Sequence, residues 1–161
     1  MSEVVSSILM IVLVLVLIGV VWGVIRNLMD KELNKTEACF GNFDKISLDD
    51  SYTCYNITST PDEFYFSINV GDINLDKILV SISIQGTTNS IELNSTSRTI
   101  ANVRNYPTRT TSISAPLRNQ GRTYIYATTI IPDSIKISPV INGEKCQESD
   151  SITNIGTCSV Y

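Results

Sequence analysis

Hydrophobic residues are distributed unevenly along the chain, and its first part is one uninterrupted apolar run. Val4 to Ile25 contains no charged residue, and nearly every position in it is Val, Leu, Ile or Met. At about 1.5 Å per residue, such a run forms a helix of roughly 33 Å, which is enough to cross the hydrocarbon core of a bilayer. No proline occurs before Pro61. We therefore expect an unbroken helix that continues to about Leu33.

Beyond about Lys35 the pattern changes to an alternation of apolar and polar residues, which is typical of strands buried on one face. It is clearest in 63–70 and 77–84, which are followed by turn residues. Weaker strands are expected at 91–94, 98–104, 109–114, 122–131, 134–140 and 152–160, with prolines between them or at their ends.

About seven to nine short strands with frequent turns predict a β-sandwich of immunoglobulin-like character. We therefore expect an α+β chain in two parts. Residues 1–34 form the long N-terminal apolar helix, and residues 35–161 form a β-sandwich domain that is large enough to bury its own core.

Charge and composition exclude several classes of function. The chain has a formal net charge of −4 and no histidine. A surface that follows nucleic-acid phosphates would be basic, so we expect no nucleic-acid partner. Histidine is the usual general base at neutral pH and the commonest metal ligand. The serines lie outside any GxSxG motif. We therefore nominate no catalytic residue, metal site or cofactor, and we expect no enzyme.

Three groups of acidic side chains are candidate calcium ligands, because carboxylates are ligands that calcium prefers. None of the groups has the spacing of a calcium-binding loop, and carboxylates in turns are their ordinary interpretation. These groups are Asp49 with Asp50, Asp62 with Glu63, and Asp72 with Asp76.

The four cysteines, Cys39, Cys54, Cys146 and Cys158, all lie outside the apolar run. None forms a CxxC pair, which disfavours a zinc site. An even number of cysteines in a secreted domain favours two disulfides. Of the three possible connectivities we favour Cys39–Cys54 with Cys146–Cys158, since each bond then closes a short loop. Four buried free thiols are the alternative.

Asn34, Asn56 and Asn94 each begin an Asn-X-Thr sequon and are candidate N-glycosylation sites in a secreted domain. Some sequons arise by chance in a chain rich in Asn, Ser and Thr. These sites therefore support an extracellular domain without deciding the question.

The charges that flank the apolar run conflict with an extracellular domain. Arg26, Lys31 and Lys35 follow the run, whereas only Glu3 precedes it, and the positive-inside rule would then place the domain in the cytoplasm. A short basic leader, cleaved from in front of Met1 on the cytoplasmic side, would remove the conflict. The run lacks the basic start and the cleavage site of a secretory signal peptide, so we expect it to be retained.

Small and charged residues in this segment are candidates for assembly. Gly19 and Gly23 form a GxxxG element, which allows helix backbones to approach closely, although glycine is also tolerated in any membrane helix. Ser6 and Ser7 lie near the start. Glu3 needs a partner, which is either the positive end of the helix dipole or a free α-amine of its own or a neighbouring copy. A position in the headgroup zone is the alternative for Glu3.

The start of the chain resembles the mature start of archaeal type IV pilins and archaellins, in the stretch Ser2-Glu3-Val4-Val5-Ser6-Ser7-Ile8-Leu9-Met10-Ile11-Val12-Leu13. The resemblance is confined to the N-terminal apolar segment. It implies a leader removed by a prepilin peptidase, storage in the membrane, and packing of the helices into a filament core by an assembly ATPase and a platform protein. Bacterial relatives place their glutamate two residues deeper and usually have a proline within the run, and this chain does neither.

We therefore expect a structural subunit of an extracellular, adhesive archaeal type IV pilus that polymerises through its N-terminal helix and lies in the membrane before assembly. The nearest alternative is an archaellin, whose filament drives swimming; the modest length and the cysteines favour the adhesive pilus. A monomeric, membrane-anchored extracellular binding module is a more distant alternative, and a membrane-anchored enzyme is the most remote.

Overall fold

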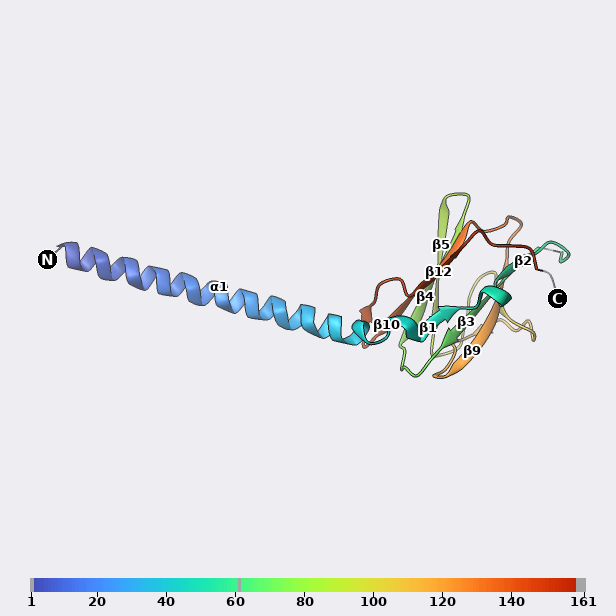
Figure 1. Ribbon diagram of the computed structural model, residues 1–161, viewed down its shortest axis with the longest axis horizontal. Coiled ribbons are helices and arrows are strands. Elements are labelled where there is room, and N and C mark those ends of the chain that lie inside the picture. Colours follow the sequence, from blue (N-terminus) through green and yellow to red (C-terminus); the bar gives the residue numbers. More distant parts are fainter. Residues whose placement is uncertain (1, 61, 159–161) are drawn as a thin grey trace. The chain divides into compact units, whose positions relative to one another are not determined.

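The computed structural model describes residues 2–60 and 62–158, apart from the side chains of residues 2–5, 31–38 and 43. The chain divides after Glu37 into a helical unit and a β-rich unit, each compact in itself. Figure 1 shows the long helix and the layered strands. The expected fold class is confirmed: a long apolar N-terminal helix is followed by a sandwich of antiparallel sheets.

Helix α1 spans Ser2–Phe40, so it continues past both the expected end near Leu33 and the expected domain boundary after residue 34. Residues 34–40 include neither glycine nor proline, and nothing there opposes the helical backbone. Gly41 follows the helix, and the amide of Asn42 donates to the carbonyl of Cys39 at 3.2 Å. The last turn of α1 belongs to the β-rich unit, which begins at Ala38.

In the part of the β-rich unit that the structure describes, short strands form two five-stranded antiparallel sheets and one two-stranded ribbon. The strands are β1 (Ile46–Leu48), β2 (Cys54–Asn56), β3 (Glu63–Val70), β4 (Lys77–Ile84), β5 (Thr87–Asn94), β6 (Arg98–Thr99), β7 (Val103–Asn105), β8 (Ser112–Ile113), β9 (Gln120–Ala127), β10 (Ser134–Ile141), β11 (Glu144–Lys145) and β12 (Asp150–Thr153). Two 3-10 helices, η1 (Phe43–Lys45) and η2 (Asp50–Tyr52), flank β1.

The first sheet has the order β1-β3-β9-β7, and β2 also pairs with β3. Strands β3 and β9 pair along their whole length, from Glu63 opposite Ala127 to Val70 opposite Gln120. The second sheet has the order β11-β10-β4-β5, and β12 also pairs with β10. Figure 1 shows β3 beside β9 in one layer, with β4, β5, β10 and β12 in the other.

The core lies between these two sheets and follows the alternation seen in the sequence. Alternate residues of β3 and β4 pack into one continuous apolar cluster, and six of them are fully buried, whereas Ile84 at the end of β4 is partly buried. The alternation therefore predicted the inward faces correctly. These residues are Phe64, Phe66 and Ile68 of β3, and Ile78, Val80 and Ile82 of β4.

The observed strands differ from the expected ones where apolar alternation is weak. Strands β1 and β2 were not expected, and each is only three residues long. Strand β5 begins at Thr87 instead of residue 91, because pairing with β4 continues through residues that are exposed on both faces. Four expected strands are shorter or shifted in the structure. The expected strand at 98–104 corresponds to β6 and β7 together, the one at 109–114 to β8, the one at 122–131 to β9, and the one at 152–160 to β12.

Pro139 lies inside β10, although prolines were expected between strands or at their ends. Its carbonyl accepts from the amide of Cys146 at 2.9 Å. The N–H and C=O of one residue point to the same side of an extended strand, so the N–H that Pro139 lacks would point to the side of β10 on which β11 and β12 lie. Pro139 falls between the residues of β10 that pair with β12 and those that pair with β11. The proline therefore leaves the pairing of β10 with β4 intact.

The disulfides connect Cys39 with Cys146 and Cys54 with Cys158, so the favoured pairing of near neighbours was wrong. The cause is the sheet topology, which brings the two ends of the domain together. The segment that ends at Cys158 runs beside β2: the amide of Tyr55 donates to Gly156 at 2.8 Å, and the amide of Cys158 donates to Tyr55 at 2.9 Å. Neighbouring positions in the fold are therefore joined across more than 100 residues of sequence, with separations of 107 and 104.

Candidate assembly helix

The apolar part of α1 is exposed on every side. Within the described residues, one helix is long and apolar enough to cross a membrane, and its candidate span is Ser6–Asp30, with a mean hydropathy of 3.3. All of the described side chains in this span are exposed. The large apolar ones are Ile8, Leu9, Met10, Ile11, Val12, Leu13, Val14, Leu15, Val16, Leu17, Ile18, Val20, Val21, Trp22, Val24, Ile25, Leu28 and Met29.

Such a surface is incompatible with water as its only surroundings. Burial of one Val, Leu, Ile or Met side chain stabilises by about 1.5–3 kcal/mol. Exposure of the whole span to water would therefore cost on the order of tens of kcal/mol. Because the helix has no polar face, a one-sided contact would leave most of this surface uncovered, so lipid or several apolar neighbours must surround it.

Gly19 and Gly23 lie on one face of α1, about 40° apart around the helix axis. Apart from the glycine itself, its two chain neighbours and the adjacent helix backbone, nothing in the described structure lies within 4 Å of the position that a Cβ at either glycine would occupy. The two residues therefore make a shallow depression in an otherwise bulky apolar surface. A second helix can approach its backbone there more closely than anywhere else on this part of α1.

Ser6 and Ser7 are exposed but do not join this depression. At 3.6 residues per turn they lie on roughly the opposite side of the helix, more than three turns earlier. The predicted assembly residues therefore fall into two separate groups. Glu3 lies in α1, but its side chain is outside the described part of the structure.

Trp22 and Arg26 lie at the end of the uncharged run Val4–Ile25. The guanidinium carbon of Arg26 lies 5.6 Å from the centroid of the Trp22 ring, which is a cation–π contact between residues four apart on the helix. Tryptophan and arginine are typical of the zone where hydrocarbon meets water. This pair was not predicted from the sequence, although the spacing of four residues at the end of the uncharged run is a usable signal.

The candidate glycosylation sites differ in their surroundings. The Oδ1 atom of Asn56 accepts from the amide of Thr58 at 2.9 Å and from its hydroxyl at 2.7 Å, which folds this sequon into a compact turn. The Oδ1 atom of Asn94 is enclosed and has no hydrogen-bond partner within the described residues. The side chain of Asn34 lies outside the described part.

Five of the six acidic residues named as candidate calcium ligands, all except Asp50, have a side-chain partner in the structure. Asp49 accepts from the amide of Ser51 and caps η2. Asp76 accepts from the amide of Gly143 at 2.6 Å, and Asp72 forms an ion pair with Arg118. Asp62 accepts from the hydroxyl of Tyr55 at 3.0 Å, and burial together with this carboxylate raises the pKa of Tyr55 to about 12.

Glu63 is a buried charge on the face of β3 that points away from the main core. Its carboxylate accepts two hydrogen bonds from Arg109, at 2.5 and 3.0 Å. It accepts a third from the hydroxyl of Tyr65 at 2.6 Å, and a fourth from Ser59 at 3.3 Å. Burial alone would raise the pKa of Glu63, but the hydrogen bonds and the positive charge of Arg109 outweigh it and hold the pKa below its ordinary value.

The length, exposure and small residues of α1 fit a helix that is covered by lipid or by other apolar helices. No family model, curated protein or solved structure matches this chain. The functional interpretation therefore depends on the residues of α1 and on the β-rich unit that follows it.

Proposed function

We propose that this protein is the structural subunit of an extracellular filament of the archaeal type IV pilus class, and that it polymerises through α1. The observation that carries the proposal is the exposure of apolar side chains on all sides of Ser6–Asp30. In a bilayer, lipid covers such a helix. Once the helix leaves the bilayer, other apolar surfaces must replace the lipid on all of its sides. Copies of the same helix are equally apolar and numerous enough to do so.

Assembly from the membrane needs an external source of energy. Lipid tails are as apolar as leucine, so the hydrophobic effect contributes little to moving α1 from lipid into a helical core. This requirement agrees with the machinery that the resemblance implies, namely a prepilin peptidase, an assembly ATPase and a platform protein. The protein is then embedded in the membrane before assembly and lies at the cell surface afterwards.

The two disulfides support an extracellular position for the β-rich unit, since disulfides persist in oxidising surroundings. A cross-linked domain suits the outer layer of an exposed filament, and we assign that filament to adhesion. Deletion of the gene should reduce attachment of the cells to surfaces and leave swimming unchanged. Loss of swimming with unchanged attachment would instead identify an archaellin.

Electron microscopy of material sheared from the cell surface, combined with mass spectrometry, tests the filament directly. We expect filaments whose subunits contain this chain and carry Cys39–Cys146 and Cys54–Cys158. Recovery of the chain only from membranes, as isolated copies in lipid, would contradict polymerisation.

Substitution of the glycines tests the role of α1. Gly19→Leu and Gly23→Leu fill the depression and should abolish or reduce filaments, because neighbouring backbones can no longer approach. Val21→Leu is the matched control: it enlarges a side chain on the opposite face of the same helix and should leave filament yield near that of the wild type. If the protein is instead a membrane-anchored monomer, all three variants should be present in the membrane in the same amount as the wild type.

A further inference from the structure

Strand β5 is an outer strand of the second sheet, so one of its edges faces away from β4. The two-residue turn before it fixes which residues bond to β4. Ile84 and Thr87 form a hydrogen-bonded pair, and every second residue of β5 after Thr87 bonds to β4 in the same way. The residues between them point their N–H and C=O groups to the free edge. These are Thr88, Ser90, Glu92 and Asn94.

The second half of this edge is covered within the subunit. The carbonyl of Glu92 accepts from the guanidinium of Arg98 at 2.6 Å. The carbonyl of Asn94 accepts from the amide of Ala115 at 2.7 Å. Both bonds agree with the outward direction of these residues, and they close this part of the edge to another strand.

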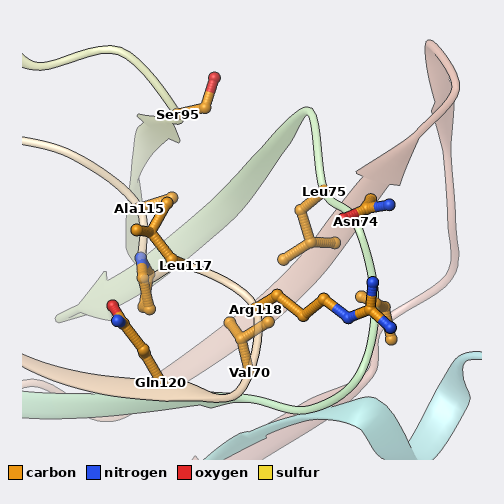
Figure 2. A pocket seen from close by; sticks show the side chains of 10 residues that line it. Val70, Asn74, Leu75, Ser95, Ala115, Leu117, Arg118 and Gln120 are labelled. Atoms are coloured by element: carbon orange, nitrogen blue, oxygen red, sulfur yellow. The ribbon is translucent and has the colours of Figure 1, made fainter.

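Figure 2 shows this covered end of β5, where Ser95 follows the strand and Ala115 lies on the segment beside it. The pocket in that view has a volume of about 310 Å³, lies beside Leu117, and has both residues in its lining. Since the segment through Ala115 occupies the edge here, a strand of another chain can pair only with the first half of β5.

The first half of the edge is open. Within the described residues, the outward backbone groups of Thr88 and Ser90 have no hydrogen-bond partner. All side chains from Thr87 to Ser90 are exposed. Natural sheets protect such edges with charged residues, prolines, bulges or covering segments. None of these devices occurs between Thr87 and Ser90, and we call this stretch the open edge.

The other outer strands that the structure describes are protected. Amides at the edges of β1, β2 and β7 donate to acceptors in the same subunit; they belong to Leu48, Tyr55, Val103 and Asn105. Strand β12 faces β1, where its Asp150 is the acceptor for Leu48. Strands β6, β8 and β11 have two residues each, which is too short to offer a comparable edge. The open edge of β5 is therefore the one that suits an added strand.

A second copy of the same hairpin fits this edge. If two β5 strands run antiparallel with Asn89 opposite its own counterpart, Thr88 of each copy lies opposite Ser90 of the other. Each such pair can exchange both backbone hydrogen bonds, so all of the outward groups of the open edge gain partners. The turn of the second copy then lies opposite Glu92, where Arg98 begins to cover the edge. A longer extended peptide would collide with Arg98.

The lack of charge also favours a copy of this chain as the partner. In a two-fold contact the same short segment meets itself, so a charged residue near the axis would repel its own counterpart. Thr87-Thr88-Asn89-Ser90 contains no charge. Threonine opposite serine is a favourable cross-strand pair, because the two hydroxyls can form a hydrogen bond.

We propose that the open edge of β5 pairs with the same edge of a second copy about a two-fold axis at Asn89. Neighbouring copies in one filament are related by a screw operation and meet through different surfaces, so a two-fold contact joins copies of two filaments. The inference rests on the proposed filament, because so short a pairing is weak by itself. It becomes effective when many copies along two filaments act together, and it makes the filaments associate side by side.

Cysteine cross-linking in the full chain tests the contact. Asn89→Cys places a thiol at a non-hydrogen-bonded antiparallel pair, whose Cα atoms lie about 4.5 Å apart, within the range of a disulfide. The four native cysteines are engaged in disulfides. Purified filaments are oxidised, dissociated and separated without reductant. We expect dimers and no larger species, because each chain carries one new thiol.

Thr87→Cys is the matched control on the same face of β5. In the proposed pairing its two copies are offset by four residues, or roughly 13 Å along the strands. Disulfides do not bridge Cα atoms more than about 7 Å apart. This variant should therefore stay monomeric, and equal dimer yields from Thr87→Cys and Asn89→Cys would overturn the proposed pairing.

A proline at the open edge tests whether backbone hydrogen bonds hold the contact. The N–H of Ser90 points away from β4, so Ser90→Pro leaves the hairpin paired and removes half of the donors between the copies. Combined with Asn89→Cys, it should lower the dimer yield by about tenfold. Ser90→Ala keeps the N–H and should leave the yield near that of Asn89→Cys alone. Equal yields from the two Ser90 variants would overturn the pairing.

Electron microscopy of the same preparations separates this inference from the proposed function. Wild-type and Ser90→Ala filaments should lie side by side, and Ser90→Pro filaments should lie apart. Intact Asn89→Cys filaments that yield no dimers would overturn the contact alone. Absence of filaments from wild-type cells would overturn the proposed function itself.

Discussion

Glu63 is a buried ionised group on the outer face of β3, and its carboxylate is stabilised by hydrogen bonds from four donor atoms. Only 5 % of its side chain is exposed, whereas its partner Arg109 is 51 % exposed. The guanidinium therefore keeps contact with water while it compensates the buried carboxylate, which lowers the desolvation cost of the pair. The hydrogen bonds between Arg109 and Glu63 also hold the loop that contains Arg109 against the outer face of β3.

Replacement of this carboxylate should destabilise the domain at neutral pH but much less in acid. Glu63→Gln removes charge-assisted hydrogen bonds, and we expect a loss of about 2 kcal/mol in the free energy of unfolding at pH 7. The folded-state pKa lies below the ordinary value of 4.5. The stabilisation is therefore complete above pH 4.5 and is lost as the pH falls through the lowered pKa.

Urea unfolding of the β-rich unit at pH 7 and pH 3 measures this difference, since the core and both disulfides lie within residues 38–161. Glu92→Gln is the matched control, because Glu92 forms an exposed ion pair with Lys77. It should change the free energy of unfolding by less than about 1 kcal/mol at either pH. An equal loss at both pH values in Glu63→Gln would contradict the role given to its charge.

Among the elements, the β4–β5 hairpin is defined more by its turn than by its side chains. Gln85 and Gly86 both have positive φ, at 49° and 76°, which is the geometry of a type I′ turn. The β10–β11 hairpin uses the same geometry at Asn142 and Gly143. Asparagine tolerates this backbone region better than glutamine does, so the β4–β5 turn carries a residue that fits it poorly.

Substitutions in this turn should change stability in opposite directions. Gln85→Asn should raise the free energy of unfolding by about 0.5 kcal/mol, because it relieves the unfavourable φ at an exposed position. Gly86→Ala should lower it by about 1 kcal/mol, because a Cβ is strained at this φ. Thermal unfolding of the two variants beside wild type measures both changes. A stabilised Gly86→Ala variant would contradict the assigned turn.

The elements that sequence could predict are those whose apolar pattern is set by the core. Strands β3 and β4 alternate because one face of each packs into the main core between the two sheets. The first half of β5 has no such pattern, since its residues are exposed on both faces and depend on the turn for their pairing. Strands β1 and β2 are too short for a period to be seen. The end of α1 could not be predicted from composition, because residues 34–40 are mostly polar and nevertheless continue the helix.

At the scale of the whole molecule, sequence could predict the candidate site but not the contacts that depend on topology. The apolar span of α1 is continuous in the chain, so its length and lack of a polar face are visible without a fold. The pocket beside Leu117 combines segments from three parts of the domain, and no local pattern announces it. The disulfide pairing likewise depends on which strands are neighbours, and short loops were therefore a poor guide.

The two disulfides also determine how a subunit would respond to tension. A pull on α1 enters the β-rich unit at its first residues, where Cys39 is joined directly to Cys146. Most of the domain lies inside this covalent loop and cannot be drawn out between the points of traction. The second disulfide, Cys54–Cys158, also carries the force directly between distant parts of the chain. The segment that can extend under tension is therefore the dozen or so residues after Cys146, and its extension is roughly 40 Å at most.

Force spectroscopy of single subunits, held at α1 and at the C-terminus, would measure this limit. We expect steps of no more than roughly 40 Å with the disulfides intact, and steps about ten times longer after reduction, when more than 100 residues can extend. Long steps without reductant would contradict the conclusion that the disulfides carry the force. A filament made of such subunits would behave as a tether of nearly fixed length, which transmits the drag on a cell to its anchor without unravelling.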